Sequence, residues 1–212
     1  MAQVIAGSIP CHASNYTKGR AGAIQYIVLH YTANDGDTAR GNCQYFSGPN
    51  RLASAHYFVD EHGVWLSVPE QDTAWHCGAN RYKHPTCRND NAIGIEMCSR
   101  KDTRGNYYIK PETVANAVRL TRTLMDKHGI PASRVLRHHD VTGKRCPQPW
   151  VQDEGQWRAF LEALEGEGNV SKEEAKKIVK EKAGLSDATI QYLAEDYRWG
   201  DELMIKLAQA MK

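Results

Sequence analysis

Runs of apolar residues along the chain indicate several β-strands. Residues 24–30 form a nearly continuous apolar run, which is typical of a buried strand. Residues 54–60 and 64–68 alternate or run apolar on either side of a short polar turn, and this pattern predicts a β-hairpin. Residues 92–97 form another strand-like run, and residues 134–137 form a short one. The pattern therefore predicts a β-sheet.

Three segments with helical spacing alternate with these strands. The first helix is expected to begin at Asp37 or Thr38 and to run to about Ser47. Residues 111–128 place apolar side chains three and four positions apart, and a glycine follows as a stop signal. Residues 154–164 place aromatic and leucine side chains on one face. Strands interleaved with helices predict an α/β domain.

A long polar segment, from about Pro69 to Asn91, separates the hairpin from the next strand. Loops of this length inside a compact domain are usually functional, and many form the wall of a binding cleft. The segment contains Trp75-His76-Cys77-Gly78. We expect it to border the functional site.

The last part of the chain has a different pattern. Residues 166–169 are a glycine-rich linker between a main domain, residues 1–165, and a small all-α element, residues 170–212. A capping box, Ser171-Lys172-Glu173-Glu174, opens its first helix, which ends near Gly184. Ser186 and Asp201 begin two more helices. A core of this size is marginal, so the element is expected to dock onto the main domain, a second copy or a polymer. Its apolar positions are Ile178, Val179, Ile190, Leu193, Leu203, Ile205 and Leu207.

Composition excludes several classes of protein. Of the 212 residues, 41% are hydrophobic, which is enough for a buried core. Lys and Arg number 27 against 25 Asp and Glu, so nothing favours binding to nucleic acid or to an anionic membrane. Membrane insertion is not expected, because no apolar run reaches the length of a transmembrane span. Residues 1–7 lack the features of a signal peptide, so synthesis in the cytoplasm is expected.

The six cysteines are irregularly spaced and do not suggest a disulfide framework. Cys77 and Cys87 flank a loop and could pair in an oxidising setting. The preferred interpretation is small buried thiols. If Cys146 binds a metal, it must be a free thiolate.

Two histidines and one cysteine are candidate metal ligands. His30 ends the apolar run 24–30, and His138 precedes Cys146 by eight positions. Two imidazoles and a thiolate suit zinc and leave its fourth position open, as in hydrolytic sites. The alternatives are a hydrogen-bonded structural role for His30 and a reduced buried Cys146 beside exposed histidines.

Lys144 and Glu96 are candidate catalytic residues. Lys144 stands between His138 and Cys146, where its ammonium would stabilise the oxyanion formed during amide hydrolysis. Glu96 interrupts an apolar strand, and an unpaired buried carboxylate is costly. Beside the attacking water it would transfer a proton to the leaving amine. The alternatives are a solvated lysine and a structural ion pair.

The chain resembles the type-2 N-acetylmuramoyl-L-alanine amidases, the zinc superfamily that includes phage endolysins, bacterial autolysins and peptidoglycan recognition proteins. Five ordered motifs between about residues 20 and 165 carry this resemblance, and the residues after Gly168 are not covered. The motifs are Val28-Leu29-His30-Tyr31-Thr32, Ser54-Ala55-His56-Tyr57-Phe58-Val59-Asp60, Ala74-Trp75-His76-Cys77-Gly78, Ile93-Gly94-Ile95-Glu96, and His138 through Lys144-Arg145-Cys146-Pro147.

The resemblance implies a metal site. His30, His138 and Cys146 match the three ligands of one Zn²⁺ per chain. His138 fits better than His139, because the family's motif places a variable residue between the ligand histidine and Asp140.

The resemblance also implies roles for residues around the metal. Glu96 matches the catalytic carboxylate, and Lys144 the oxyanion partner. Ala55 stands where one subgroup has a catalytic tyrosine, which places the chain in the Glu-dependent endolysin and autolysin branch. Trp75 and His76 are expected to line the cleft for glycan or stem peptide, although packing is the commoner role of an aromatic side chain in such a loop.

The implied fold is a central mixed β-sheet with helices on both faces. The implied function is hydrolysis of the amide bond between N-acetylmuramoyl and L-alanine in peptidoglycan. The alternatives are a peptidoglycan-binding module without catalysis and an enzyme of muropeptide recycling, which usually has an acidic ligand at the position of Cys146. Without a signal peptide, a phage or prophage endolysin released through a holin fits best. The C-terminal helices would then bind the cell wall or form a homo-oligomer.

Overall fold

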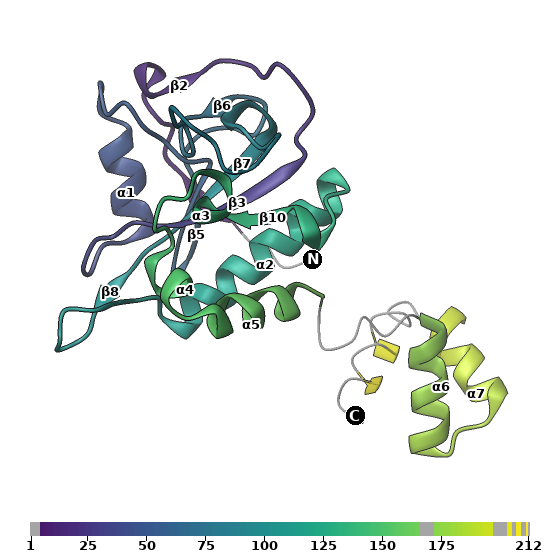
Figure 1. The fold of residues 1–212 in the computed structure, drawn as a ribbon. Coiled ribbons are helices and arrows are strands. Elements are labelled where there is room, and N and C mark those ends of the chain that lie inside the picture. The colour runs from purple at the N-terminus through teal and green to yellow at the C-terminus, as the bar shows by residue number, and fades with distance from the viewer. Residues whose placement is uncertain (1–4, 166–171, 197–202, 205–206, 209–210, 212) are drawn as a thin grey trace. The chain divides into compact units, whose positions relative to one another are not determined.

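The computed structural model describes residues 5–165, 172–196, 203–204, 207–208 and 211. The chain divides into two compact units, residues 1–164 and residues 165–212 (Figure 1). Within the described residues, no helix is long and apolar enough to cross a membrane.

The first unit is built on a six-stranded mixed sheet with the order β1-β5-β4-β7-β3-β10. Strands β4 and β5 form the predicted antiparallel hairpin, whereas the pairs β4–β7, β7–β3 and β3–β10 are parallel. The five predicted strands are therefore confirmed, whereas β1 was not predicted. The strands are β1 (Ile5–Ser8), β3 (Tyr26–Tyr31), β4 (Tyr57–Asp60), β5 (Gly63–Leu66), β7 (Ala92–Met97) and β10 (Val135–Arg137).

Two short strand pairs were not predicted. Strand β2 (Tyr16–Thr17) pairs with β6 (Thr73–Ala74), and β8 (Arg100–Lys101) pairs with β9 (Tyr107–Tyr108). Each strand has only two residues, too few to show an alternation of apolar and polar positions. The pair β2–β6 places part of the long segment 69–91 beside the N-terminal segment.

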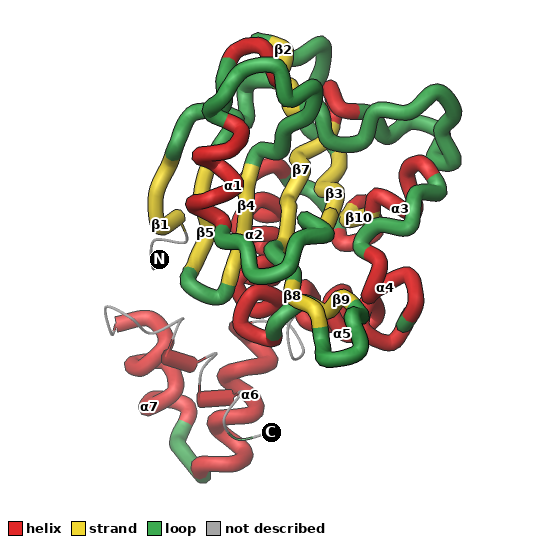
Figure 2. Tube along the Cα trace, turned by 90° about the vertical axis from the view of Figure 1, so that its left-hand side faces the viewer, coloured by secondary structure: helices red, strands yellow, loops and turns green. Residues whose placement is uncertain are grey.

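Helices cover both faces of the sheet (Figure 2), as the predicted fold class requires. Helix α1 (Ala39–Phe46) packs on β4 and β5, and Thr38 caps it by accepting the main-chain N–H of Gly41. The helices α2 (Pro111–His128) and α5 (Glu154–Glu165) contribute to the main core on the opposite face. The shorter helices are α3 (His138–Thr142), α4 (Gln148–Gln152) and the 3-10 turns Ala13–Asn15, Asn89–Asn91 and Ala132–Arg134.

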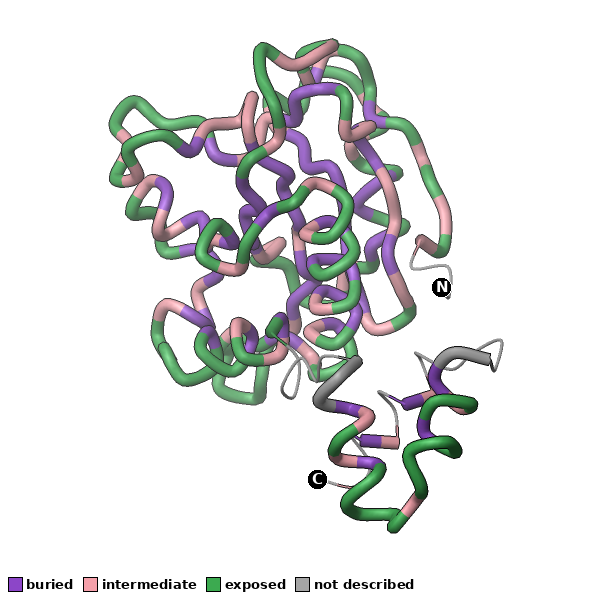
Figure 3. Tube along the Cα trace, turned by 90° about the vertical axis from the view of Figure 1, so that its right-hand side faces the viewer, coloured by how far each residue is buried: buried purple, intermediate pink, exposed green. Residues whose placement is uncertain are grey.

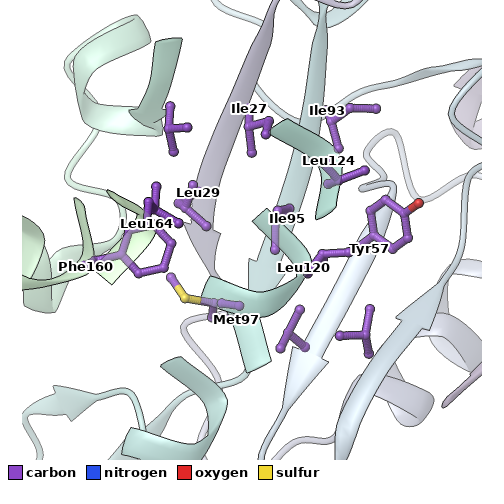
Figure 4. Packing of buried hydrophobic residues seen from close by; sticks show 14 of the residues in the cluster. Ile27, Leu29, Tyr57, Ile93, Ile95, Met97, Leu120, Leu124, Phe160 and Leu164 are labelled. Carbon is purple, nitrogen blue, oxygen red and sulfur yellow. The ribbon is translucent and has the colours of Figure 1, made fainter. Parts of the chain in front are cut away.

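Alternation along the central strands separates the core from the functional face. Ile27 and Leu29 of β3, like Ile95 of β7, pack against α2 and α5 (Figure 4). The central strands are largely buried (Figure 3). Because successive side chains of a strand point to opposite faces, His30 and Glu96 lie on the face opposite this core.

The second unit has a small apolar core of its own. Helix α6 (Lys172–Ala183) ends before Gly184, and Ser186 caps helix α7 (Asp187–Gln191), as predicted. A π-helical turn, Tyr192–Asp196, follows. The predicted start of the first helix at Ser171 and of the third at Asp201, and the apolar position Ile205, lie outside the described residues. The buried positions are Ala175, Val179, Ile190, Ala194, Met204 and Ala208.

Candidate metal and catalytic centre

The sheet brings an imidazole and a carboxylate side by side. His30 of β3 and Glu96 of β7 are direct partners in the parallel register. His30 is only 1% exposed, and one carboxylate oxygen of Glu96, Oε2, is buried. Strands β3 and β7 thus place His30 and Glu96 next to each other, on the face of the sheet opposite the main core.

The neighbouring strand delivers His138 and Cys146. Strand β10 pairs with β3 and leads directly into α3, whose first residue is His138. This histidine-rich segment forms a short helix. Arg137 fixes its start through ion pairs with Asp140 at 3.0 Å and Glu154 at 2.8 Å. The carbonyl of Cys146 accepts the main-chain N–H of His139 at 2.8 Å, which folds the cysteine back beside the helix.

The donor atoms of His30, His138 and Cys146 all lie within 4.8 Å of one another. Nδ1 of His30 is 3.8 Å from Sγ of Cys146. Tetrahedral zinc with usual Zn–N and Zn–S distances separates such atoms by ~3.6 Å. Nδ1 of His138 is buried and has no hydrogen-bond partner among the described residues, as expected of a ligand atom that awaits a cation. The three side chains therefore fit a zinc ion.

Burial favours the neutral form of these three ligands. It lowers the pKa of His138 to about 4, with Lys144 adding to the effect, and the pKa of His30 falls well below its ordinary value. Neutral imidazole is the form that binds metals. Burial, with the nearby Glu96, raises the pKa of the Cys146 thiol to about 12. A cation is needed to hold Cys146 as a thiolate at neutral pH.

The side chain of Glu96 is half-buried, and its carboxyl group has an altered acidity. Burial raises its pKa to about 8; nearby Lys144 opposes this shift, and Asp37 adds to it. Oε2 of Glu96 has no hydrogen-bond partner in the described part of the chain. A carboxyl group in this state can accept and return a proton near neutral pH.

All five residues line one cavity of about 260 Å³. Lys144 is exposed at its rim, on the turn after α3. Two larger hollows share lining residues with this cavity. One, of about 640 Å³, includes His138 and Lys144, and the other, of about 680 Å³, includes Glu96 and Asp37. The centre is therefore open to a ligand larger than water.

Trp75 and His76 line the same cavity, on the predicted cleft wall. Nε1 of Trp75 donates to the hydroxyl of Thr17 at 2.9 Å, and Nδ1 of His76 lies 3.0 Å from Nε2 of His30. Their contact with substrate stays a prediction.

Sequence reasoning missed two residues behind the site, the buried His56 and the half-buried Arg20. Arg20 donates to the carbonyls of Asp90 and Ala92, at 2.9 Å and 3.1 Å, and contacts Nε2 of His56. Nδ1 of His56 accepts the main-chain N–H of Gly94 at 2.9 Å. Only the second motif drew attention to His56, and Arg20 lies in a glycine-rich segment without a recognisable pattern.

All six cysteines, which lie within the described residues, are buried and free. Cys77 and Cys87 share one apolar cluster with Val28 and Val141. The preferred interpretation of these residues as buried thiols agrees with this arrangement.

The fold and the site define an α/β domain with three metal donors, a carboxylate and a lysine on one cavity. Residues 20–149 match the family Amidase_2, described as N-acetylmuramoyl-L-alanine amidase, and the chain belongs to this family. The resemblance to its endolysin and autolysin branch is confirmed.

Similar proteins are known from sequence and structure. A probable N-acetylmuramoyl-L-alanine amidase of Bacillus licheniformis is 40% identical over 161 residues, which are 70% of this chain and 44% of that protein. The amidase CwlL of the same organism is 37% identical over 162 residues, with the same two coverages. The chain thus spans about half the length of the curated relatives it matches. The structure of PlyL has a TM-score of 0.61 and 27% identity, covering 76% of this chain and 96% of that one.

Proposed function

We propose that this chain is a zinc-dependent hydrolase that cleaves the amide bond between N-acetylmuramoyl and L-alanine in peptidoglycan. The observation that carries the proposal is the convergence of His30, His138 and Cys146 beside Glu96 on one cavity. The named amidases among the relatives supply the substrate class. Three protein donors leave one position of a tetrahedral ion for water or substrate.

A zinc ion held by these three side chains would supply a Lewis acid for the scissile carbonyl and lower the pKa of a nearby water towards ~7. Glu96 accepts the proton of the attacking water on its carboxylate. It then delivers this proton to the nitrogen of L-alanine as the C–N bond breaks. A residue that serves as base and then as acid needs a pKa near the working pH, and burial raises the pKa of Glu96 towards that range.

Lys144 supplies the positive charge for the oxygen of the tetrahedral intermediate. It lies on the short turn between α3 and Cys146, so it belongs to the same folded segment as two metal donors. Such charges, fixed before the reaction begins, stabilise a transition state without reorganisation. Exposure of Lys144 at the rim also leaves it accessible to substrate.

The test is a digest of purified peptidoglycan followed by mass spectrometry of the soluble products. The proposal predicts stem peptides that begin with a free L-alanine amino group, without new reducing sugar ends. Activity should disappear after chelation and return with zinc. New reducing ends instead of free L-alanine would contradict the proposed bond. Wall binding without any product would support the alternative, a binding module.

A further inference from the structure

His30 has two ring nitrogens with different surroundings. Nδ1 faces Cys146, whose Sγ is 3.8 Å away. Nε2 lies 3.0 Å from Nδ1 of His76, and the two rings meet edge to face with centroids 5.1 Å apart. His76 is not one of the three clustered metal donors. His76 contacts His30, one of the proposed metal ligands, and does not itself belong to the donor cluster.

The donor and the acceptor in this contact depend on the tautomers of the two rings. A histidine that binds a metal through Nδ1 must keep its lone pair on that atom, so its proton lies on Nε2. The Nε2–H group then donates to Nδ1 of His76, which accepts as part of a neutral ring. A hydrogen bond of this kind fixes both the tautomer and the orientation of a ligand ring.

Asn89, Gly94 and His56 surround His76 and fix the position of its ring. Oδ1 of Asn89 accepts the main-chain N–H groups of His76 and Cys77, at 3.2 Å and 2.8 Å. The absence of a side chain at Gly94 makes room for the ring, because a Cβ there would lie 2.5 Å from Cγ of His76. His56, bonded to the N–H of Gly94, packs edge to face on the other side with centroids 5.8 Å apart.

We propose that His76 is a positioning residue for the metal centre, which holds His30 in the tautomer and orientation that binds zinc through Nδ1. The inference rests on the proposed zinc site and adds to it a residue outside the ligand set. It gives the cleft-lining His76 a role in metal affinity that does not require contact with substrate.

The experiment compares zinc affinities of full-length variants by competition with a chromophoric chelator. Leucine and asparagine share the branching and the number of side-chain heavy atoms, but only His76→Asn keeps an acceptor near the place of Nδ1. The expected result is ~10- to 100-fold weaker zinc binding in His76→Leu, as for other residues that support a metal ligand, and recovery of most of the loss in His76→Asn. His84→Leu is the control, because His84 lies in the same loop and bonds to the Cys87 N–H instead.

Urea unfolding of the metal-free proteins shows whether each variant is folded. If His76→Leu is unfolded, His76→Phe provides the same loss of the acceptor with a ring in place. Equal zinc affinities for wild type and the folded acceptor-free variant would overturn the inference while leaving the zinc site intact. Equal weakening in His84→Leu would also overturn it. A wild type that binds no zinc would overturn both proposals.

Discussion

Replacing Glu96 with glutamine is expected to stabilise the metal-free protein, and to do so more at pH 8 than at pH 5. Burial raises the pKa of Glu96 from 4.5 to about 8. The unfolded chain therefore loses this proton at lower pH than the folded protein. Between these two values, the folded state binds more protons, so its stability falls as the pH rises. Glutamine has a similar shape and no charge. Glu96→Gln therefore removes the free-energy cost of an ionised carboxylate at this site.

The magnitude follows from the size of the pKa shift. One pKa unit corresponds to ~1.4 kcal/mol, so the full shift from 4.5 to about 8 sets an upper limit of ~5 kcal/mol. Glu96 lines an open cavity, and solvent there weakens the effect of burial. We expect Glu96→Gln to gain ~2–3 kcal/mol at pH 8 and almost nothing below pH 4.5.

The assay is urea unfolding of wild type and Glu96→Gln at several pH values, with a chelator present. Glu70→Gln is a matched control of opposite sign. Tyr57, Lys127 and His128 all bond to Glu70 and hold its pKa below the ordinary value. Its substitution should destabilise the protein above pH 4.5. The same free energy of unfolding for Glu96→Gln and wild type across pH 5–8 would refute the reasoning.

Three substitutions and one truncation test other parts of the chain. Lys144→Ala should lower kcat ~100- to 1,000-fold, the usual loss on removing an oxyanion donor, without changing the zinc content; unchanged kcat would contradict its role. Cys146→Ser should lose zinc by elemental analysis, because a hydroxyl is a poor replacement for a thiolate; full zinc content would contradict this ligand. Gly94→Ala should destabilise the protein by ~1–3 kcal/mol in urea unfolding, because its Cβ overlaps the ring of His76; a neutral effect would contradict this packing. Deleting residues 169–212 should reduce wall pelleting or oligomer mass; unchanged values for both would exclude a targeting or self-association role.

Much of the fold could be predicted from the sequence because its main signals are local. Residues 92–97 and 111–128 coincide with β7 and α2, since an apolar run and a helical repeat mark their own bounds. The strand order could not be found in this way. The pairing of β3 with both β7 and β10 depends on residues far apart in the chain. The two-residue strands left no periodic signal.

The candidate site could be predicted only as a set of residues. Their types and the motif order singled out His30, Glu96 and the segment from His138 to Cys146. The sequence did not show the contact between His30 and His76, because a hydrogen bond across 46 positions leaves no local pattern. Arg20 was missed for the same reason, since its partners lie on distant loops.

The most direct test of the central claim compares purified wild type with Glu96→Ala. Elemental analysis gives the metal content, and labelling of new L-alanine amino termini gives the cleavage of peptidoglycan. The account predicts about one zinc per chain in both proteins, with new amino termini only in wild type. Zinc without cleavage by wild type would contradict the proposed enzyme, and wild type without zinc would contradict the metal centre on which the mechanism rests.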